Sequence, residues 1–444
     1  MSEWKKVKIG DFLTEREGRY KPNDKEISKY QRLDKIDFSG HIHISDKPTK
    51  TDMIIVFPGD LVISGINVAK GAISVYQGKE PVCATIHYSS YTFDDKKVDL
   101  DYFKYFVKSP AFIFALQQQV KGGIKTEIKP KHLLPLEISL PDLSTQKEIV
   151  KVLSKKIEKV ELIKSEIESQ KAYAKQLRQN ILQEAIEGKL TEEWRKENPV
   201  VKGNPDFDAE VLFEKIQEEK CHTNSKKKVF EPISENEQPF EIPEGWKWVK
   251  IEHLAEVGTG ATPLTSEKKY YENGTIPWIT SSSTGNDFVS KADVFITEIA
   301  LKETNCSLNP KGTLVVAMYG QGKTRGQITE LCIEAATNQA CATIKIFEKD
   351  NVVLKKYIKF VFKKMYEEIR SFAQGGTQPN LNLGKIANTI FPLPPLAEQK
   401  EIVSRVEKLL ANVTELEKQI TEREEMTKQL MQSIMKDAFE WRCL

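Results

Sequence analysis

Apolar side chains recur at alternating intervals of three and four residues in two long stretches of this chain. The first stretch is Val160–Ile181, where charged residues such as Lys164 and Glu168 fill the other faces. This heptad pattern is typical of a coiled coil and predicts a helix from about Ser144 to Glu187, about 65 Å long. The second stretch, Val413–Ile434, carries the same pattern. Each helix therefore needs a partner for its apolar side.

The two helices belong to an internal repeat. The pentapeptide Gln-Lys-Glu-Ile-Val stands at residues 146–150 and again at 399–403, an offset of 253 residues that also relates the double glycines at 122–123 and 375–376. The predicted core positions are Val160, Ile163, Ile167, Gln170, Ala174, Leu177 and Ile181, with Val413, Leu416, Ile420, Arg423, Thr427, Leu430 and Ile434 as their equivalents. Two matched helices can cover each other's apolar stripe within one chain, and we expect this pairing. The alternative is that each helix lies separately on a globular core.

Polar residues interrupt the predicted seam at one equivalent pair, Gln170 and Arg423. Polar groups inside a coiled coil fix its register and pairing at some cost in stability.

The segments between the helices predict an α/β (α+β) fold with strands dominating. Residues 60–64, 313–317 and 71–76 read as strands, and residues 103–118 and 354–372 read as helices. The two globular halves share a loose framework, because Trp4–Ile9 aligns with Trp246–Ile251 and Pro58–Val62 aligns with Pro310–Val315 after a one-residue insertion. We therefore expect an internal pseudo-two-fold repeat of a globular domain followed by a long helix.

Residues 188–244 are typical of a linker, with Pro, Gly and Asn clusters and a short predicted helix at 208–220. The basic run Lys226–Lys228 is interpreted as solvated linker, with phosphate contact as the alternative.

Composition excludes several classes of protein. The 444 residues contain no run of eighteen apolar residues and no apolar N-terminal stretch, so a cytoplasmic protein without a membrane span or signal peptide is expected. Six cysteines lie scattered without a Cys-x-x-Cys pair, which favours free thiols and gives no zinc signature. The net charge is only +2, but residues 1–140 hold 22 Lys and Arg against 18 Asp and Glu, and residues 246–391 hold 18 against 14. A polyanion would thus meet two basic domains on an acidic frame.

No catalytic constellation stands out. Residues Ala317–Thr324 resemble a phosphate-binding loop, but alanine replaces its first glycine and the residues after it are a poor helix start. Gly258–Ala261 is too short for a cofactor fingerprint, and His41 and His43 have no evident third metal ligand. The Asn/Asp-Pro-Pro-Tyr/Phe tetrapeptide of amino-methyltransferases is absent. The sequence therefore predicts a binding protein and not an enzyme.

Several motifs identify a family resemblance. Pro392–Val403, leading into a heptad helix, resembles the conserved regions of the specificity subunits of type I restriction-modification systems. The segments Leu190–Arg195, Ile242–Trp246, Gly260–Pro263 and Ile276–Ile279 are similar to the same family. The first half departs from this pattern, because Ser139–Asp142 replaces the double proline and Ser144–Thr145 replaces Ala397–Glu398.

The resemblance implies two target-recognition domains separated by two antiparallel helices that form an intramolecular coiled coil. The implied boundaries are recognition domain 1 at 1–142, spacer helix 1 at 143–190, a linker at 191–243, recognition domain 2 at 244–392 and spacer helix 2 at 393–444. Each domain would read one half of an interrupted double-stranded DNA target, and the helices would set the half-site spacing and dock partners. The implied partners are two modification subunits that methylate adenine N6 with S-adenosylmethionine, and restriction subunits that use ATP and Mg²⁺. The chain itself would hold no cofactor.

DNA contacts are expected from Lys, Arg, Asn, Gln, Ser and Thr on glycine-flanked loops. The candidates are Asn67, Lys70 and Lys125 in the first half and Thr280, Ser281, Ser282, Ser283, Gln321, Lys323, Arg325 and Gln378 in the second. The alternative for each is a polar side chain that merely solvates a surface turn. For the whole chain, the alternatives are a self-sufficient methyltransferase, which the missing tetrapeptide disfavours, and a coiled-coil scaffold unrelated to DNA.

Overall fold

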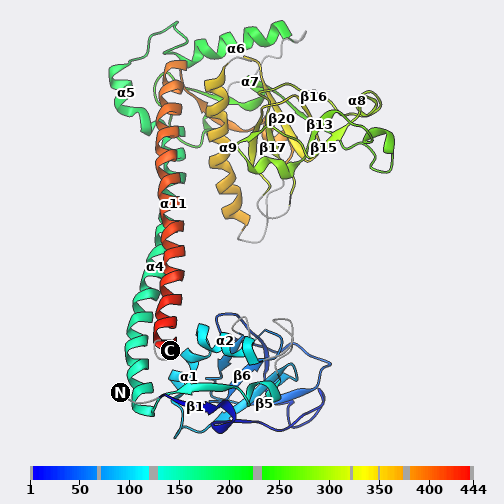
Figure 1. Ribbon diagram of the computed structural model, residues 1–444. Coiled ribbons are helices and arrows are strands. Elements are labelled where there is room, and N and C mark those ends of the chain that lie inside the picture. The colour runs from blue at the N-terminus through cyan, green and yellow to red at the C-terminus, as the bar shows by residue number, and fades with distance from the viewer. Residues whose placement is uncertain are drawn as a thin grey trace. The chain divides into compact units, whose positions relative to one another are not determined.

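The computed structural model describes residues 4–67, 72–119, 129–223, 233–320, 324–348, 351–373 and 381–440. The chain divides into unit 1, residues 1–170 with 419–444, and unit 2, residues 171–418. It is a mixed α/β structure with two sheet-rich domains (Figure 1). The two long helices, α4 (Leu143–Ile186) and α11 (Leu396–Glu440), each contribute one part to either unit. The expected fold class and first long helix are confirmed.

Unit 1 holds the first sheet-rich domain. Its strands are β1 (Lys5–Lys8), β2 (Leu13–Glu15), β3 (Arg32–Ile36), β4 (Ile42–Ser45), β5 (Met53–Val56), β6 (Leu61–Ser64), β7 (Ile73–Val75), β8 (Val82–Thr85), β9 (Tyr88–Phe93) and β10 (Glu137–Leu140). Its shorter helices are η1 (Ile9–Asp11), α1 (Leu100–Phe106), α2 (Pro110–Gln119) and α3 (Pro130–Leu133). The described strands are ordered β1-β10, β2-β9-β6-β7 and β4-β3-β8-β5.

Unit 2 holds the second domain. Its strands are β11 (Lys247–Lys250), β12 (Ala255–Thr259), β13 (Ile276–Ile279), β14 (Phe288–Val289), β15 (Val294–Ile296), β16 (Leu308–Asn309), β17 (Leu314–Ala317), β18 (Ile328–Leu331), β19 (Ala335–Thr337), β20 (Cys341–Ile346) and β21 (Ile390–Leu393). Its shorter helices are η3 (Lys189–Thr191), α5 (Glu192–Glu197), α6 (Ala209–Thr223), η4 (Glu235–Glu237), α7 (Ile251–Leu254), η5 (Lys268–Tyr270), η6 (Ser281–Gly285), α8 (Glu298–Glu303), α9 (Val352–Ala373) and α10 (Leu383–Ala387).

The two domains share one strand topology. The orders β11-β21, β12-β20-β17-β18-β14 and β15-β13-β19-β16 reproduce those of unit 1, with β14 added at one edge. The directions also agree, since β3 pairs with β8 and β13 with β19 in parallel, whereas β6 with β7 and β17 with β18 are antiparallel. The loose sequence repeat therefore corresponds to a common framework.

The central strands β6 and β17 show how the framework arises from sequence. Each is a run of four residues buried on both faces, as a continuous apolar or small-residue run predicts. Each follows a turn in which glycine adopts a positive φ of 88°, Gly59 before β6 and Gly312 before β17. Each glycine N–H donates to the carbonyl at the end of the neighbouring strand, Tyr76 O at 2.8 Å or Leu331 O at 2.7 Å. Only glycine adopts this conformation without steric cost.

One predicted helix is two helices in the structure. The stretch 103–118 was expected to be continuous, but α1 ends at Phe106 and α2 begins at Pro110. Proline has no N–H to donate to the preceding turn and disfavours helical geometry in the residue before it. Ser109 lies in the break between the two helices, and its side-chain oxygen accepts a hydrogen bond from Phe112 N in the first turn of α2 at 3.3 Å.

The helices α4 and α11 pack against each other in antiparallel orientation. Arg423 donates to Gln170 at 3.0 Å in unit 1, and Arg178 forms an ion pair with Glu417 at 2.8 Å in unit 2. Residue numbers thus fall along one helix as they rise along the other. Gln170 and Arg423 are also separated by the repeat offset of 253 residues, so this contact joins two equivalent positions of the repeat.

The seam between these helices is only half covered. The buried positions are Val160, Ile167, Ala174 and Ile181 on α4 and Val413, Ile420, Thr427 and Ile434 on α11. The alternate positions remain open, since Ile163, Leu177, Leu416 and Leu430 are 37–45% exposed. The expected pairing of the two helices within the chain is confirmed, and each helix leaves one of its two heptad positions partly exposed.

The repeated pentapeptide begins each long helix in the same way. Gln146 and Gln399 are fully buried, and each donates from Nε2 to the carbonyl five residues earlier, Pro141 O at 2.8 Å or Pro394 O at 2.7 Å. The proline-rich segment before each helix leaves this carbonyl without a backbone donor, and the side-chain amide of the glutamine donates to it instead.

Three of the motifs that carry the family resemblance meet around the buried carboxylate of Glu398. It accepts from Thr191 Oγ1 at 2.7 Å, pairs with Arg195 at 2.6 Å and accepts from Trp246 Nε1 at 2.7 Å. In unit 1 the repeat-equivalent residue is Thr145, and Trp4 Nε1 is buried without a hydrogen-bond partner among the described residues. Because Thr145 stands where unit 2 has Glu398, the buried ion pair of unit 2 cannot form at this position of unit 1.

Part of the segment expected to be a linker packs into the core of unit 2. The predicted helix at 208–220 is confirmed as α6, and Ala209, Leu212 and Ile216 on it are fully buried in the core of unit 2. The run Lys226–Lys228 lies outside the described residues.

Candidate nucleic-acid interface

Two loops of unit 2 that carry predicted DNA-contacting residues lie next to each other. The first is η6, and the second connects β17 to β18. The second loop is closed by Gly326 N donating to Ala317 O at 2.8 Å and Gln327 N donating to Thr324 O at 3.1 Å. Thr284 Oγ1 of η6 approaches Gln327 Oε1 at 3.4 Å, so the two loops form one polar surface.

The structure describes five of the predicted contact residues in unit 2. Thr280 and Ser281–Ser283 are exposed or half-buried, and the hydroxyl groups of Thr280 and Ser282 lie 2.7 Å apart. Arg325 is half-buried on the β17–β18 loop, and its Nε is buried without a hydrogen-bond partner in the described part of the chain. Gln321, Lys323 and Gln378 lie outside the described residues.

In unit 1, the equivalent loop connects β6 to β7. Asn67 is half-buried there, and its carbonyl accepts from Ala72 N at 3.2 Å. Lys70 and Lys125 lie outside the described residues. The β6–β7 and β17–β18 loops occupy the same place in the shared topology, which agrees with the alignment that suggested both as contact loops. Contact of any of these residues with DNA stays a prediction.

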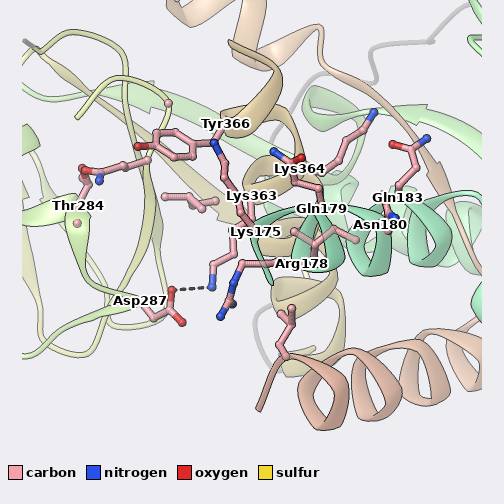
Figure 2. A pocket seen from close by; sticks show the side chains of 16 residues that line it. Lys175, Arg178, Gln179, Asn180, Gln183, Thr284, Asp287, Lys363, Lys364 and Tyr366 are labelled. Carbon is pink, nitrogen blue, oxygen red and sulfur yellow. Dashed lines mark hydrogen bonds and ion pairs between the residues drawn. The ribbon is translucent and has the colours of Figure 1, made fainter. Parts of the chain in front are cut away.

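A pocket of about 510 Å³ adjoins the two loops of unit 2 and involves residues that the sequence did not single out. Figure 2 shows Lys175 and Arg178 from α4 and Lys363 and Lys364 from α9 around it. Asp287 is the one carboxylate among the lining residues, and Lys363 pairs with it at 2.6 Å. Nothing in the sequence analysis linked these residues, and only the packing of α9 beside α4 brings the four cations together.

Lysines and an arginine stabilise the ionised form of Asp287. Burial by itself raises the pKa of this carboxyl, but Lys363, Lys359 and Arg178 outweigh it and hold the pKa below its usual value. Lys359 is buried, donates to Asp287 O at 2.8 Å and lies 3.9 Å from the ring centroid of Phe288. Burial lowers the pKa of Lys359 in turn.

Other chemistry considered from the sequence finds no support in the described residues. No group of three or more His, Cys, Asp or Glu side chains there could hold a metal ion. The segment Ala317–Thr324 leads into strand β18 and not into a helix, so it lacks the helix N-terminus of a phosphate-binding loop. Among the described helices, none has a stretch long and apolar enough to cross a lipid bilayer.

Comparison with known proteins gives a consistent result. Residues 1–170 and 243–425 match the family described as the type I restriction modification DNA specificity domain. The chain is 33% identical over 171 residues to the type I restriction enzyme MjaIX specificity subunit of Methanocaldococcus jannaschii, covering 37% of each protein. It is 26% identical over 322 residues to the EcoDI specificity subunit of Escherichia coli, covering 72% of this chain and 65% of that protein. The matched parts thus span between about one third and two thirds of these relatives.

Two solved structures share the fold. One, from work on complex assembly and conformational transition of the type I R-M system, has a TM-score of 0.63 at 14% identity and covers 98% of this chain and 97% of that chain. The HsdS subunit from Thermoanaerobacter tengcongensis has a TM-score of 0.50 at 16% identity and covers 98% and 96%.

Proposed function

Because the chain belongs to the type I restriction modification DNA specificity family, we propose that it is the DNA-recognition subunit of a multisubunit adenine-N6 methyltransferase. In this proposal the chain is not itself an enzyme: it selects the DNA sequence, and partner subunits bind S-adenosylmethionine and transfer the methyl group. A cytoplasmic location follows from a chromosomal DNA substrate.

The observation that carries the proposal is the duplicated domain on a shared helix pair. Two domains of one topology, attached to helices of fixed register, suit an interrupted target in which each domain reads one half. The proposed recognition domains are residues 1–142 and 244–392, and the proposed spacer helices are 143–190 and 393–444 with the linker at 191–243. The base pairs between the half-sites need no contact.

Base and phosphate contacts are assigned to the loops of the candidate interface. Arg325 and the hydroxyl-rich segment Thr280–Ser283 supply donors of the kinds that read base edges and phosphates. Asn67 takes the equivalent place in the first domain. Lys70, Lys125, Gln321, Lys323 and Gln378 remain candidates on sequence grounds.

The open half of the helix seam supports docking of two modification subunits. In unit 1 the exposed apolar stripe consists of Ile163, Met426 and Leu430, and in unit 2 it consists of Leu416, Tyr173 and Leu177. These two sets are related residue by residue through the repeat offset of 253, with the helices exchanged. Exposed apolar patches of this kind mark interaction sites. Two equivalent stripes fit two copies of one partner.

Methylation mapping tests the proposal. The chain is co-expressed with its neighbouring methyltransferase in a host without adenine methylation, and modified adenines are mapped across the genome. The expected result is one bipartite motif with an unread gap, and replacing residues 1–142 by the corresponding domain of a relative changes only one half. Methylation that is absent, independent of this chain or spread over unrelated sequences contradicts the proposal. A coiled-coil scaffold unrelated to DNA predicts that outcome.

A further inference from the structure

The connection between β3 and β4 in the first domain takes the same place in the fold as η6 in the second. β3 lies between antiparallel β4 and parallel β8, and β13 lies in the same way between β15 and β19. The β13–β15 connection, residues 280–293, contains η6, whose residues are candidates for DNA contact. Its counterpart is the shorter β3–β4 tip (residues 37–41), and no residue of this tip was predicted from the sequence to contact DNA.

A lysine holds each of these two connections through the backbone. In the first domain, Lys108 Nζ, in the break between α1 and α2, donates to Ser39 O at 2.8 Å. In the second domain, Lys359 Nζ on α9 donates to Asp287 O at 2.8 Å. The helices α1 and α9 follow the equivalent strands β9 and β20, so the two hydrogen bonds come from corresponding parts of the repeat.

The β3–β4 tip also lies beside the contact loop of its own domain. Gly40 is buried with a positive φ of 85°, and a Cβ atom added to it would lie 2.9 Å from the carbonyl oxygen of Ile73. Ile73 is the first residue of β7, where the β6–β7 loop ends. In the second domain, Thr284 of η6 approaches Gln327, the last residue of the β17–β18 loop. The same two segments therefore meet in both domains.

The carboxylate of Asp37 fixes the shape of the tip. It accepts from Ser39 N at 3.0 Å, from Ser39 Oγ at 2.6 Å and from His41 N at 2.9 Å, and it lies 2.9 Å from His43 Nε2. These hydrogen bonds, that of the Ser39 hydroxyl group first, hold the pKa of Asp37 well below its usual range. The carboxylate is therefore used within the tip.

The side chains that the tip presents to solvent suit the edges of bases. Phe38 is 61% exposed, and His41 is exposed with its ring edge against that of His43 at 4.9 Å between centroids. A phenyl ring can contact the methyl group of thymine, and imidazole nitrogens can donate or accept hydrogen bonds. The major groove of DNA is wide enough for a two-stranded β-ribbon such as β3 and β4.

We propose that the β3–β4 tip is a second DNA-reading element of the first domain, in which Phe38 and His41 contact base edges in the major groove. The inference rests on the proposed function and adds contacts to those assigned to Asn67 and the β6–β7 loop. Lys108 is a positioning residue in this proposal, because it holds the backbone of the tip and does not itself contact a base.

The test uses the assembled methyltransferase with the double variant Phe38→Ala/His41→Ala. Binding of target DNA is expected to weaken about tenfold, and sequence preference is expected to relax at one or two base pairs of a single half-site. Titration with substituted target duplexes and mapping of methylated adenines measure both effects. The affected half-site must be the one that changes when residues 1–142 are replaced by the domain of a relative. Thermal unfolding of the complex is expected to stay the same.

Phe114→Ala is the matched control, because Phe114 is 62% exposed on α2. It is expected to leave both affinity and sequence preference unchanged. An unchanged motif and affinity in the double variant, or an equal loss with the control, overturns the inference. Loss of bound methyltransferase subunits with unaltered preference would assign the tip to a protein contact and overturn it as well. If the unaltered complex methylates no bipartite motif, the proposed function itself fails.

Lys108→Met gives a second test through the backbone of the tip. Without the hydrogen bond to Ser39 O, preference is expected to relax at the same base pairs as in the double variant. Lys108→Arg keeps a donor and is expected to restore part of it. Lys104→Met, which breaks the exposed ion pair with Asp101 on α1, is the control and should change nothing. Relaxation at other base pairs, or in the second half-site, contradicts the proposal.

Discussion

Single side chains explain why the two halves can share a framework without sharing every interaction. The buried Glu398 joins Thr191, Arg195 and Trp246 in unit 2, whereas Thr145 stands at the equivalent position in unit 1. A buried carboxylate needs its partners, because an uncompensated charge in the interior is costly. The sequence shows the motifs, but nothing in their spacing says that residues 191, 195, 246 and 398 meet.

Replacing Glu398 with Gln is expected to destabilise unit 2 by about 3 kcal/mol, since Arg195 loses its counter-charge in a buried setting. Hydrogen exchange of the slowest amides measures this, with unit 1 as an internal reference. Glu401→Gln breaks a partly exposed ion pair with Arg405 on the same helix and should cost less than about 1 kcal/mol. Equal effects of the two substitutions would contradict the assigned role of Glu398.

Arg325→Ala tests the candidate interface at the level of one residue. Arg325 is half-buried on the β17–β18 loop, beside the hydroxyl-rich segment of η6. Losing a base or phosphate contact is expected to weaken specific DNA binding by about 1 to 3 kcal/mol. The assembled methyltransferase is titrated with target and non-target DNA, and Lys302→Ala, a surface lysine of α8, serves as control. Unchanged affinity and preference would remove Arg325 from the interface.

Elements of secondary structure followed the apolar patterns closely where no residue breaks the period. The strands β6 and β17 and the helices α4 and α9 lie where the patterns place them, within a few residues. The predicted helix at 103–118 failed at Pro110, a signal that was present in the sequence but outweighed by the apolar run around it. Local pattern locates an element, and the residues that break it decide where it ends.

The turn before each central strand gives a prediction at this scale. Alanine at Gly312 or Gly59 must adopt the left-handed conformation, which costs about 1 to 2 kcal/mol. The added methyl group meets no backbone at either position, so the conformation itself carries the cost. Urea unfolding of the single variants measures it. Gly285→Ala, at an exposed glycine without a positive φ, should be nearly neutral, and a similar loss there would contradict the explanation.

At the scale of the whole molecule, the repeat gives each unit the same exposed apolar stripe built from exchanged helices. Leu177 in unit 2 and Leu430 in unit 1 are equivalent members, both 45% exposed. Leu177→Asp and Leu430→Asp are each expected to reduce the complex from two methyltransferase subunits to one, and the double variant to none. Native mass spectrometry counts the subunits, and Ser165→Asp on another face of α4 is the control. Retention of two subunits in the double variant would exclude the stripes as docking sites.

The sequence by itself determined the duplicated plan, the long helices, the class of fold and the family, because repeats and heptads are periodic and need no knowledge of distant contacts. Only the tertiary structure decided which heptad positions of the helix seam are buried and that helix α6 of the expected linker packs into the core of unit 2. It also decided that Glu398 contacts Thr191, Arg195 and Trp246, which belong to two other motifs of the family resemblance. It also created the pocket of unit 2, since Lys175 and Lys364 are 189 positions apart in the chain and only helix packing makes them neighbours. Packing brings together residues whose separation along the chain leaves no local signal.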